Sequence, residues 1–160
     1  MKKINKFLLG FRSLVIGMIL IFFSLSKLTG APQTVEQFEQ MAKPIGLNPT
    51  FFRSSTGLIL LIVAYLYIAS GGIDIMKIKK PNSLKLNHYK LMLFTNIFGV
   101  IAMFGALGAE FFLRTSPKYP LVFLSSAIIF SSIANLKVIV KHVSLDGFKL
   151  IKVSPEASIA

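Results

Sequence analysis

Four ionisable side chains lie within or at the borders of long apolar stretches, which makes them the first candidates for chemistry. Arg12 and Asp74 fall near one border of these stretches, and Lys27 and Glu110 fall near the other. A charged side chain costs about 2.5–3.5 kcal/mol at the centre of a membrane helix and less near its ends. Opposite charges at matched depth therefore suggest two pairs, Arg12 with Asp74 and Lys27 with Glu110. Two other interpretations stay open: each side chain reaches the lipid headgroups alone, or the charges form a proton or substrate site.

The remaining residues offer no familiar catalytic or cofactor-binding constellation. The chain has no cysteine, which excludes disulfides, iron–sulfur clusters and thiolate zinc sites. Its two histidines, His88 and His142, fall outside the predicted spans, so a haem held between two histidines inside the membrane is not expected. The sequence contains no serine–histidine–aspartate set, metal-binding cluster or phosphate-binding loop. It therefore argues against a stand-alone enzyme and predicts no cofactor bound through the chain's own ligands.

A second group of polar residues lies within the apolar stretches. Ser125, Ser132 and Asn135 fall on one side of a helix, and Asn96 falls at a depth comparable to that of Asn135. Such groups commonly join helices through hydrogen bonds that average about 0.6 kcal/mol in bilayers. The alternative is a polar binding cavity. Small residues one turn apart are expected to allow close helix approach: Ala102 with Ala106, and Gly105 with Ala109.

The elements that must position these residues are membrane-spanning helices. Of the 160 residues, 54% are hydrophobic, and the charged residues occur in bands separated by long uncharged stretches. A helix needs roughly 20 mostly apolar residues to cross a hydrocarbon core about 30 Å thick. The stretches that meet this requirement are about 7–25, 51–73, 91–109 and 121–140. We therefore predict an all-α fold, a four-transmembrane-helix bundle formed by a single domain, residues 1–142.

Both terminal segments have a second interpretation. The basic start and apolar core of the first span also resemble a signal peptide, but the length of the core and the lack of an A-x-A-like cleavage site favour a retained span. Residues 143–160 are expected to form a loosely ordered cytoplasmic tail. The alternative for this tail is a hairpin, because Asp146-Gly147 stands between two alternating segments.

The longest hydrophilic connection joins the first two spans. Thr34 followed by Gln37 is typical of a capping box, and it predicts a short helix over 35–42 on the outer side of the membrane. Asn48-Pro49 then predicts the start of the second span, with the asparagine as the N-cap and the proline at the first helical position.

The distribution of lysine and arginine predicts the orientation of the bundle. Of these residues, 13 lie on the side that holds both termini, and 5 lie on the other side. Basic residues in short loops favour the cytoplasm, so we expect both termini to be cytoplasmic. A reporter fused after Ala160 that became active in the periplasm would contradict this orientation. The net charge of +12 is accordingly expected to face anionic lipid and not nucleic acid.

A distinctive pattern ends the first span. Ser24, a small residue, stands three before Lys27, and an apolar residue and a short polar stretch with proline follow within the segment 22–35. With Gly57 opening an apolar second span and four spans in all, the chain resembles DoxX-like membrane proteins. Ser24 stands where glycine is usual in that family, and Leu60 occupies a position that often carries an acidic residue. The second departure puts in doubt any family chemistry that needs a buried carboxylate there.

The resemblance implies a small protein of the bacterial inner membrane, and some DoxX-like proteins are subunits or anchors of quinone-linked redox assemblies. We therefore expect an accessory subunit that contacts the lipid bilayer and a redox partner subunit, and that could meet a quinone. Phe94, Phe98 and Phe104 are expected to face lipid or to pack, although a quinone ring could stack on them. The alternative function is a transporter or channel for a small solute or proton. Four short spans make a thin wall for a pore, so this alternative requires a homo-oligomer.

Overall fold

The structure is a computed structural model that describes the backbone of residues 3–75, 82–114 and 116–153, and the side chains of residues 7–73, 75, 88–114 and 116–141. Within these ranges the chain is all-α. Its long helices are α1 (Lys3–Leu28), α3 (Pro49–Ile75), α4 (Asn82–Gly108) and α5 (Tyr119–Val153). Its short helices are α2 (Pro32–Ala42), the 3₁₀ turn η1 (Lys43–Ile45) and the π-helical turn η2 (Ala109–Leu113).

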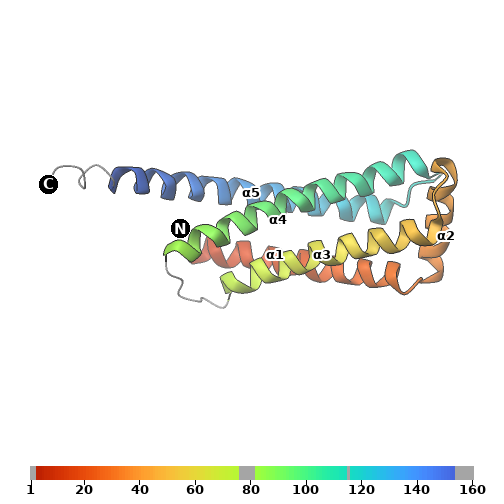
Figure 1. The fold of residues 1–160 in the computed structure, drawn as a ribbon, viewed down its shortest axis with the longest axis horizontal. Helices are drawn as coiled ribbons and strands as arrows, with labels where there is room; N and C mark the ends of the chain where they lie inside the picture. The colour runs from red at the N-terminus through yellow and green to blue at the C-terminus, as the bar shows by residue number, and fades with distance from the viewer. Residues whose placement is uncertain (1–2, 76–81, 115, 154–160) are drawn as a thin grey trace.

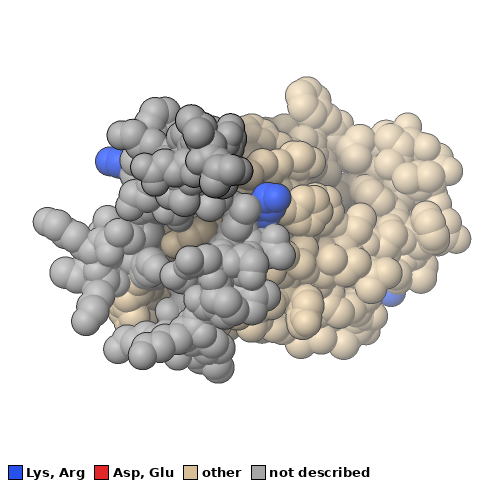
Figure 2. Space-filling view, turned by 60° about the vertical axis from the view of Figure 1, so that its left-hand side comes forward, with Lys and Arg blue, Asp and Glu red and all other residues tan. Residues whose placement is uncertain are grey.

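The four long helices contain segments that are long and apolar enough to cross a membrane. These segments, found in the described part of the chain, are Phe7–Leu28, Pro49–Ile73, His88–Leu113 and Tyr119–Lys141. Large apolar side chains on them face outward, as in Phe22 and Phe123, which are 71% and 77% exposed. Figure 2 shows a face of the molecule whose described surface is uncharged apart from isolated Lys or Arg atoms. The chain is therefore a multi-pass integral membrane protein, which confirms the prediction from the spacing of the charge bands.

The long helices form two pairs. α1 packs along α3 and α4 packs along α5, and the fewer contacts between the pairs are mostly those of α3 with α4. Figure 1 shows α2 lying across one end of the bundle, while the N-terminus lies at the other. We call these ends the α2 end and the opposite end. The two pairs are therefore joined by close contacts along only part of their length.

Small residues at every seventh position hold α1 close to α3. They face one another in antiparallel order, and we call this contact the small-residue seam: Gly10 with Gly71, Gly17 with Ala64, and Ser24 with Gly57. A β-carbon placed on Gly71 would lie 2.7 Å from the carbonyl oxygen of Gly10, and one placed on Gly17 would lie 3.1 Å from that of Ala64. The Ser24 hydroxyl donates a hydrogen bond of 2.7 Å to the carbonyl oxygen of Gly57. Close backbone approach of this kind drives helix association in lipid, where the hydrophobic effect between helices is absent.

Two apolar clusters fill the bundle. The larger one, nearer the α2 end, includes Leu20, Leu60, Val63, Tyr67 and Ile128. The smaller one, nearer the opposite end, consists of Leu9, Met92 and Ile139, with Tyr89 and Leu93 packed against it.

Buried polar side chains join the helices between these clusters. Asn135 Nδ2 donates to Asn96 Oδ1 at 3.2 Å, which links α5 to α4. The hydroxyls of Tyr67 and Ser132 share a hydrogen bond of 2.7 Å, which links α3 to α5. Ser132 and Asn135 therefore join helices, the first of the two roles considered for them.

Two helix starts test the predicted caps. Asn48 accepts a hydrogen bond of 3.1 Å from the backbone N–H of Phe51, so the predicted N-cap of the second span is confirmed. The predicted capping box at Thr34 and Gln37 is wrong, because α2 begins at Pro32, one turn earlier. Proline is favoured in the first turn, where no backbone donor is needed, and the Thr34 hydroxyl hydrogen-bonds the Ser26 hydroxyl at 2.9 Å instead.

Two boundaries extend beyond their predicted positions. α5 continues to Val153, so the expectation that residues 143–153 form a loose tail or a hairpin is wrong. A single glycine such as Gly147 is tolerated inside a helix. The helix therefore continues through Asp146-Gly147, although this dipeptide is typical of a turn. The third span begins at His88, which is 8% exposed and lies at the end of the span and not outside it.

Candidate functional site

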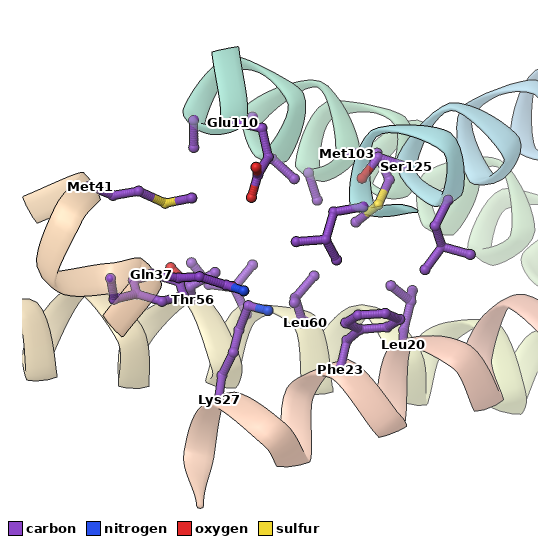
Figure 3. A pocket seen from close by; sticks show the side chains of 18 of the residues that line it. Leu20, Phe23, Lys27, Gln37, Met41, Thr56, Leu60, Met103, Glu110 and Ser125 are labelled. Carbon is purple, nitrogen blue, oxygen red and sulfur yellow. The ribbon is translucent and has the colours of Figure 1, made fainter. Parts of the chain in front are cut away.

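A cavity of about 340 Å³ lies between the two helix pairs at the α2 end. Figure 3 shows Lys27 entering it from α1 and Glu110 entering it from the facing wall, with Leu60, Met103 and Ser125 further along. Its walls are mostly apolar, and they come from α1, α2, α3, α4, η2 and α5. This combination of apolar walls with a few polar groups at one end is typical of small-molecule sites.

Small residues of α4 make room for the cavity. Ala102, Gly105 and Ala106 of α4 line it, as does Ala109, the first residue of η2. A β-carbon placed on Gly105 would meet nothing within 4 Å. The predicted close helix approach is therefore wrong at Gly105, where the missing side chain leaves space instead of a tight contact.

The most exposed residues that line the cavity stand on α3 and α4. Two of its lining residues are exposed, Ile59 on α3, with 46% of its surface, and Gly105 on α4. Both belong to membrane-spanning segments. The exposed part of the cavity wall therefore belongs to membrane-spanning helices.

α2 covers the end of the cavity. Phe38 and Met41 line the cavity from α2 and are only 4% and 5% exposed. The Phe38 ring meets the Phe52 ring of α3 edge to face, with centroids 5.1 Å apart. Gln37 brings a side-chain amide to the same end. α2 thus acts as an apolar cover that carries one polar group.

Lys27 is held in place by aromatic and backbone contacts. Its Nζ lies 5.6 Å from the centroid of the Phe23 ring and 5.8 Å from that of Phe38, both within cation–π range. Arg53 donates a hydrogen bond to its carbonyl oxygen, and a β-carbon on Gly57 would lie 3.1 Å from its Cβ. Within the described residues, no ion pair or hydrogen bond reaches the Nζ atom.

Glu110 lies on the π-helical turn and accepts three hydrogen bonds. Arg114 Nη1 donates to both of its carboxylate oxygens, at 3.1 and 2.9 Å, which forms a buried ion pair. The backbone N–H of Lys118 donates to Oε2 at 3.2 Å. The charge of the Glu110 carboxylate is therefore balanced by Arg114, one turn later in the chain. Its hydrogen bond with the backbone of Lys118 also fixes the connection that leads to α5.

The structure brings one of the two predicted charge pairs to a common site. Lys27 and Glu110 line the same cavity, but the ion pair of Glu110 is with Arg114 and none joins it to Lys27. Arg12 is half-buried on α1, and the Asp74 side chain lies outside the described residues, as does the predicted Arg12–Asp74 pair.

The residues that carry the family resemblance lie together. Ser24 is bonded to Gly57, and Gly57 packs against Lys27, so the three form one contact at the edge of the cavity. Leu60, which stands at the position often acidic in the family, is 8% exposed and lines the cavity. The motif positions thus shape this site.

Several site residues were missed from the sequence. The aromatic walls come from Phe23, Phe38 and Phe52, whereas Phe94 and Phe104 are each 58% exposed on the outer surface. Arg114 stands four residues after Glu110, a spacing at which opposite charges meet on a helix, and this signal was available. The aromatic residues gave no such signal, because phenylalanines occur throughout the apolar segments.

Ser125 lines the cavity, so of the polar residues in the fourth span it alone fits the alternative of a polar binding cavity. Among the residues with described side chains, no three of His, Cys, Asp or Glu lie together as a metal site would need.

Comparison of the chain with protein-family models, curated proteins and solved structures gave no match. The resemblance to DoxX-like proteins therefore depends on the residues alone.

Proposed function

We propose that this protein is an accessory or anchoring subunit of a quinone-linked redox assembly, of the DoxX-like type, and that its cavity receives the quinone ring. The observation that supports this is the cavity of about 340 Å³ with apolar walls and polar groups at one end. Ligand sites of proteins typically measure about 300–1,000 Å³ and combine these features. In this proposal the redox partner subunit carries the electrons to or from the ring.

The residues present fit such a ring. Phe23, Phe38 and Phe52 offer aromatic faces and edges, and Lys27 and Gln37 bring N–H donors for carbonyl oxygens. In this proposal an isoprenoid tail stays in lipid beside the exposed lining residues of α3 and α4, Ile59 and Gly105, while the ring enters. A bound quinone would supply reversible uptake of electrons and protons, and the chain's own side chains would bind and orient it.

The orientation and location belong to the same proposal. The excess of lysine and arginine at the opposite end, 13 against 5, favours a cytoplasmic position for that end. We accordingly place both termini in the cytoplasm of a bacterium and the cavity in the outer leaflet of its inner membrane, with residues 1–142 as one domain.

The alternative, an oligomeric transporter or channel for a small solute or proton, has less support. Beyond the cavity the centre of the bundle is filled, because Val63, Ala64 and Tyr67 are fully buried. A single chain therefore offers no open path in its described part, and transport would need an interface between copies.

Native mass spectrometry of the full chain, released from its own membranes in mild detergent, tests the proposal. We expect the wild type to retain a quinone and a redox protein. Gly105→Leu should lower quinone occupancy on the order of tenfold or more, because the new side chain takes the space of the ring. It should leave the redox protein bound.

Gly108→Leu is the matched control. It adds the same side chain to the same helix at a glycine that also has nothing within 4 Å and does not line the cavity. Its quinone occupancy should equal that of the wild type. A wild type that retains neither quinone nor redox protein would refute the proposal, and equal losses in both variants would refute the assignment of the cavity.

A further inference from the structure

We propose that the cavity binds its ligand as an anion, with the Lys27 ammonium as the counter-ion. This inference rests on the proposed function and narrows it: within the quinone class, the preferred ligand is a ring with an ionised hydroxyl group and not a neutral ring.

Glu110 cannot serve as the free counter-charge of the cavity. Both of its oxygens accept from Arg114, and Oε2 also accepts from the backbone of Lys118. The side chains of Arg114 and Glu110 are only 4% and 7% exposed, so the pair is shielded from water. The charges of Arg114 and Glu110 therefore sum to zero, and with Lys27 added the three groups carry a net charge of plus one.

Lys27 is the unbalanced charge. Its Nζ lies over the faces of Phe23 and Phe38, and within the described residues it forms no ion pair or hydrogen bond; Glu110 acts on it only through space, across the cavity. The carboxylates nearest in sequence, Glu36 and Glu39, do not line the cavity. An ammonium in an apolar chamber is poorly solvated, and an anion that enters beside it regains the lost interaction.

The walls around Lys27 favour a flat ring over an alkyl headgroup. Phe23 and Phe38 flank the ammonium, and Leu20, Leu60 and Met103 line the deeper part of the cavity. A ring whose ionised oxygen meets Nζ can stack against these aromatic side chains. Figure 3 shows Lys27 and Gln37 pointing to the same region, so the amide can donate to a second oxygen of the ring.

Two matched ligands test the charge. 2-Hydroxy-1,4-naphthoquinone is an anion at neutral pH, and 2-methoxy-1,4-naphthoquinone has the same ring without the charge. Their dissociation constants are measured by calorimetry on the full chain in lipid nanodiscs. For each protein we take the ratio of the dissociation constant of the methoxy compound to that of the hydroxy compound. We expect this ratio to be about 10- to 100-fold larger for the wild type than for Lys27→Met, the range that one charge-assisted hydrogen bond gives.

Variants separate charge from structure. Lys27→Arg keeps the charge and should keep most of the preference. Lys43→Met removes a lysine that is exposed at the same end and does not line the cavity, so its preference should match that of the wild type. Comparing ratios between variants also cancels the different partitioning of the two compounds into lipid.

The outcomes are distinct. If both compounds bind and the ratio of their dissociation constants is the same for the wild type and Lys27→Met, the anion proposal is overturned while quinone binding stands. If neither compound binds, the proposed function fails with it. Dodecanoate, an anion without a ring, should compete roughly two- to tenfold less well than the hydroxy compound; equal competition would overturn the preference for a ring.

Discussion

Gly71→Ala is expected to destabilise the protein by about 1–3 kcal/mol, while Gly72→Ala, one residue further along the same helix, leaves its stability unchanged. The new methyl group of the first variant would lie 2.7 Å from the carbonyl oxygen of Gly10 and 3.1 Å from the backbone nitrogen of Leu14. Backbone atoms cannot rotate away as a side chain can. α1 and α3 must therefore separate along the small-residue seam, which loosens their packing over several turns.

The two variants make a closely matched comparison. Both replace a helical glycine of α3 by alanine, so the change in helix propensity is the same, but a β-carbon on Gly72 meets nothing within 4 Å. The measurement is the temperature at which half of the detergent-solubilised protein aggregates. A Gly71→Ala variant as stable as Gly72→Ala would show that α1 and α3 do not approach as closely as the structure has them.

The sequence predicted the class of fold because the bilayer imposes a strong constraint on it. Backbone groups in lipid must be satisfied within each segment, so apolar length alone predicts helices, and all four spans are present near their expected positions. Helix pairing is a weaker signal. We expected close packing at Gly105 of the third span, yet Gly105 has open space, and the contacts between helix backbones are those of Gly10 and Gly17 with α3. A spacing of seven on both α1 and α3 was visible, but which helix faces which is decided by three-dimensional packing.

The sequence predicted the depth of the site residues in the membrane, but not which of them form ion pairs with one another. Lys27 and Glu110 were expected at the same depth, because each lies near the same end of its span, and both line one cavity. Depth along the membrane does not specify direction around the helix axis. The carboxylate of Glu110, on a π-helical turn that the sequence did not reveal, meets Arg114 in its own segment. The short helix over 35–42 was predicted, but its role as the cover of the cavity was not, because that role depends on how the connection folds back over the bundle.

Double-mutant cycles can distinguish a Glu110–Arg114 ion pair from a Glu110–Lys27 ion pair. The first of these cycles is expected to show a large loss of stability. Glu110→Gln leaves the Arg114 guanidinium buried without an opposite charge, and breaking a buried pair in this way costs about 3–5 kcal/mol. Adding Arg114→Met to the same chain removes the stranded charge, so most of that loss should be regained. The free energies of unfolding of the single and double variants, measured in the same detergent, give the coupling between the two residues.

The cycle of Glu110→Gln with Lys27→Met is the comparison that decides between the partners. Because Lys27 has no direct bond to Glu110 in the structure, its coupling to Glu110 should be much smaller than that of Arg114. Lys27→Met alone should cost little stability or even raise it, since it removes a buried ammonium that forms no ion pair or hydrogen bond within the described residues. A Lys27 coupling as large as the Arg114 coupling would restore the ion pair inferred from matched depth. It would also remove the unbalanced charge on which anion binding depends, so the same set of variants tests the stability of the site and the basis of its selectivity.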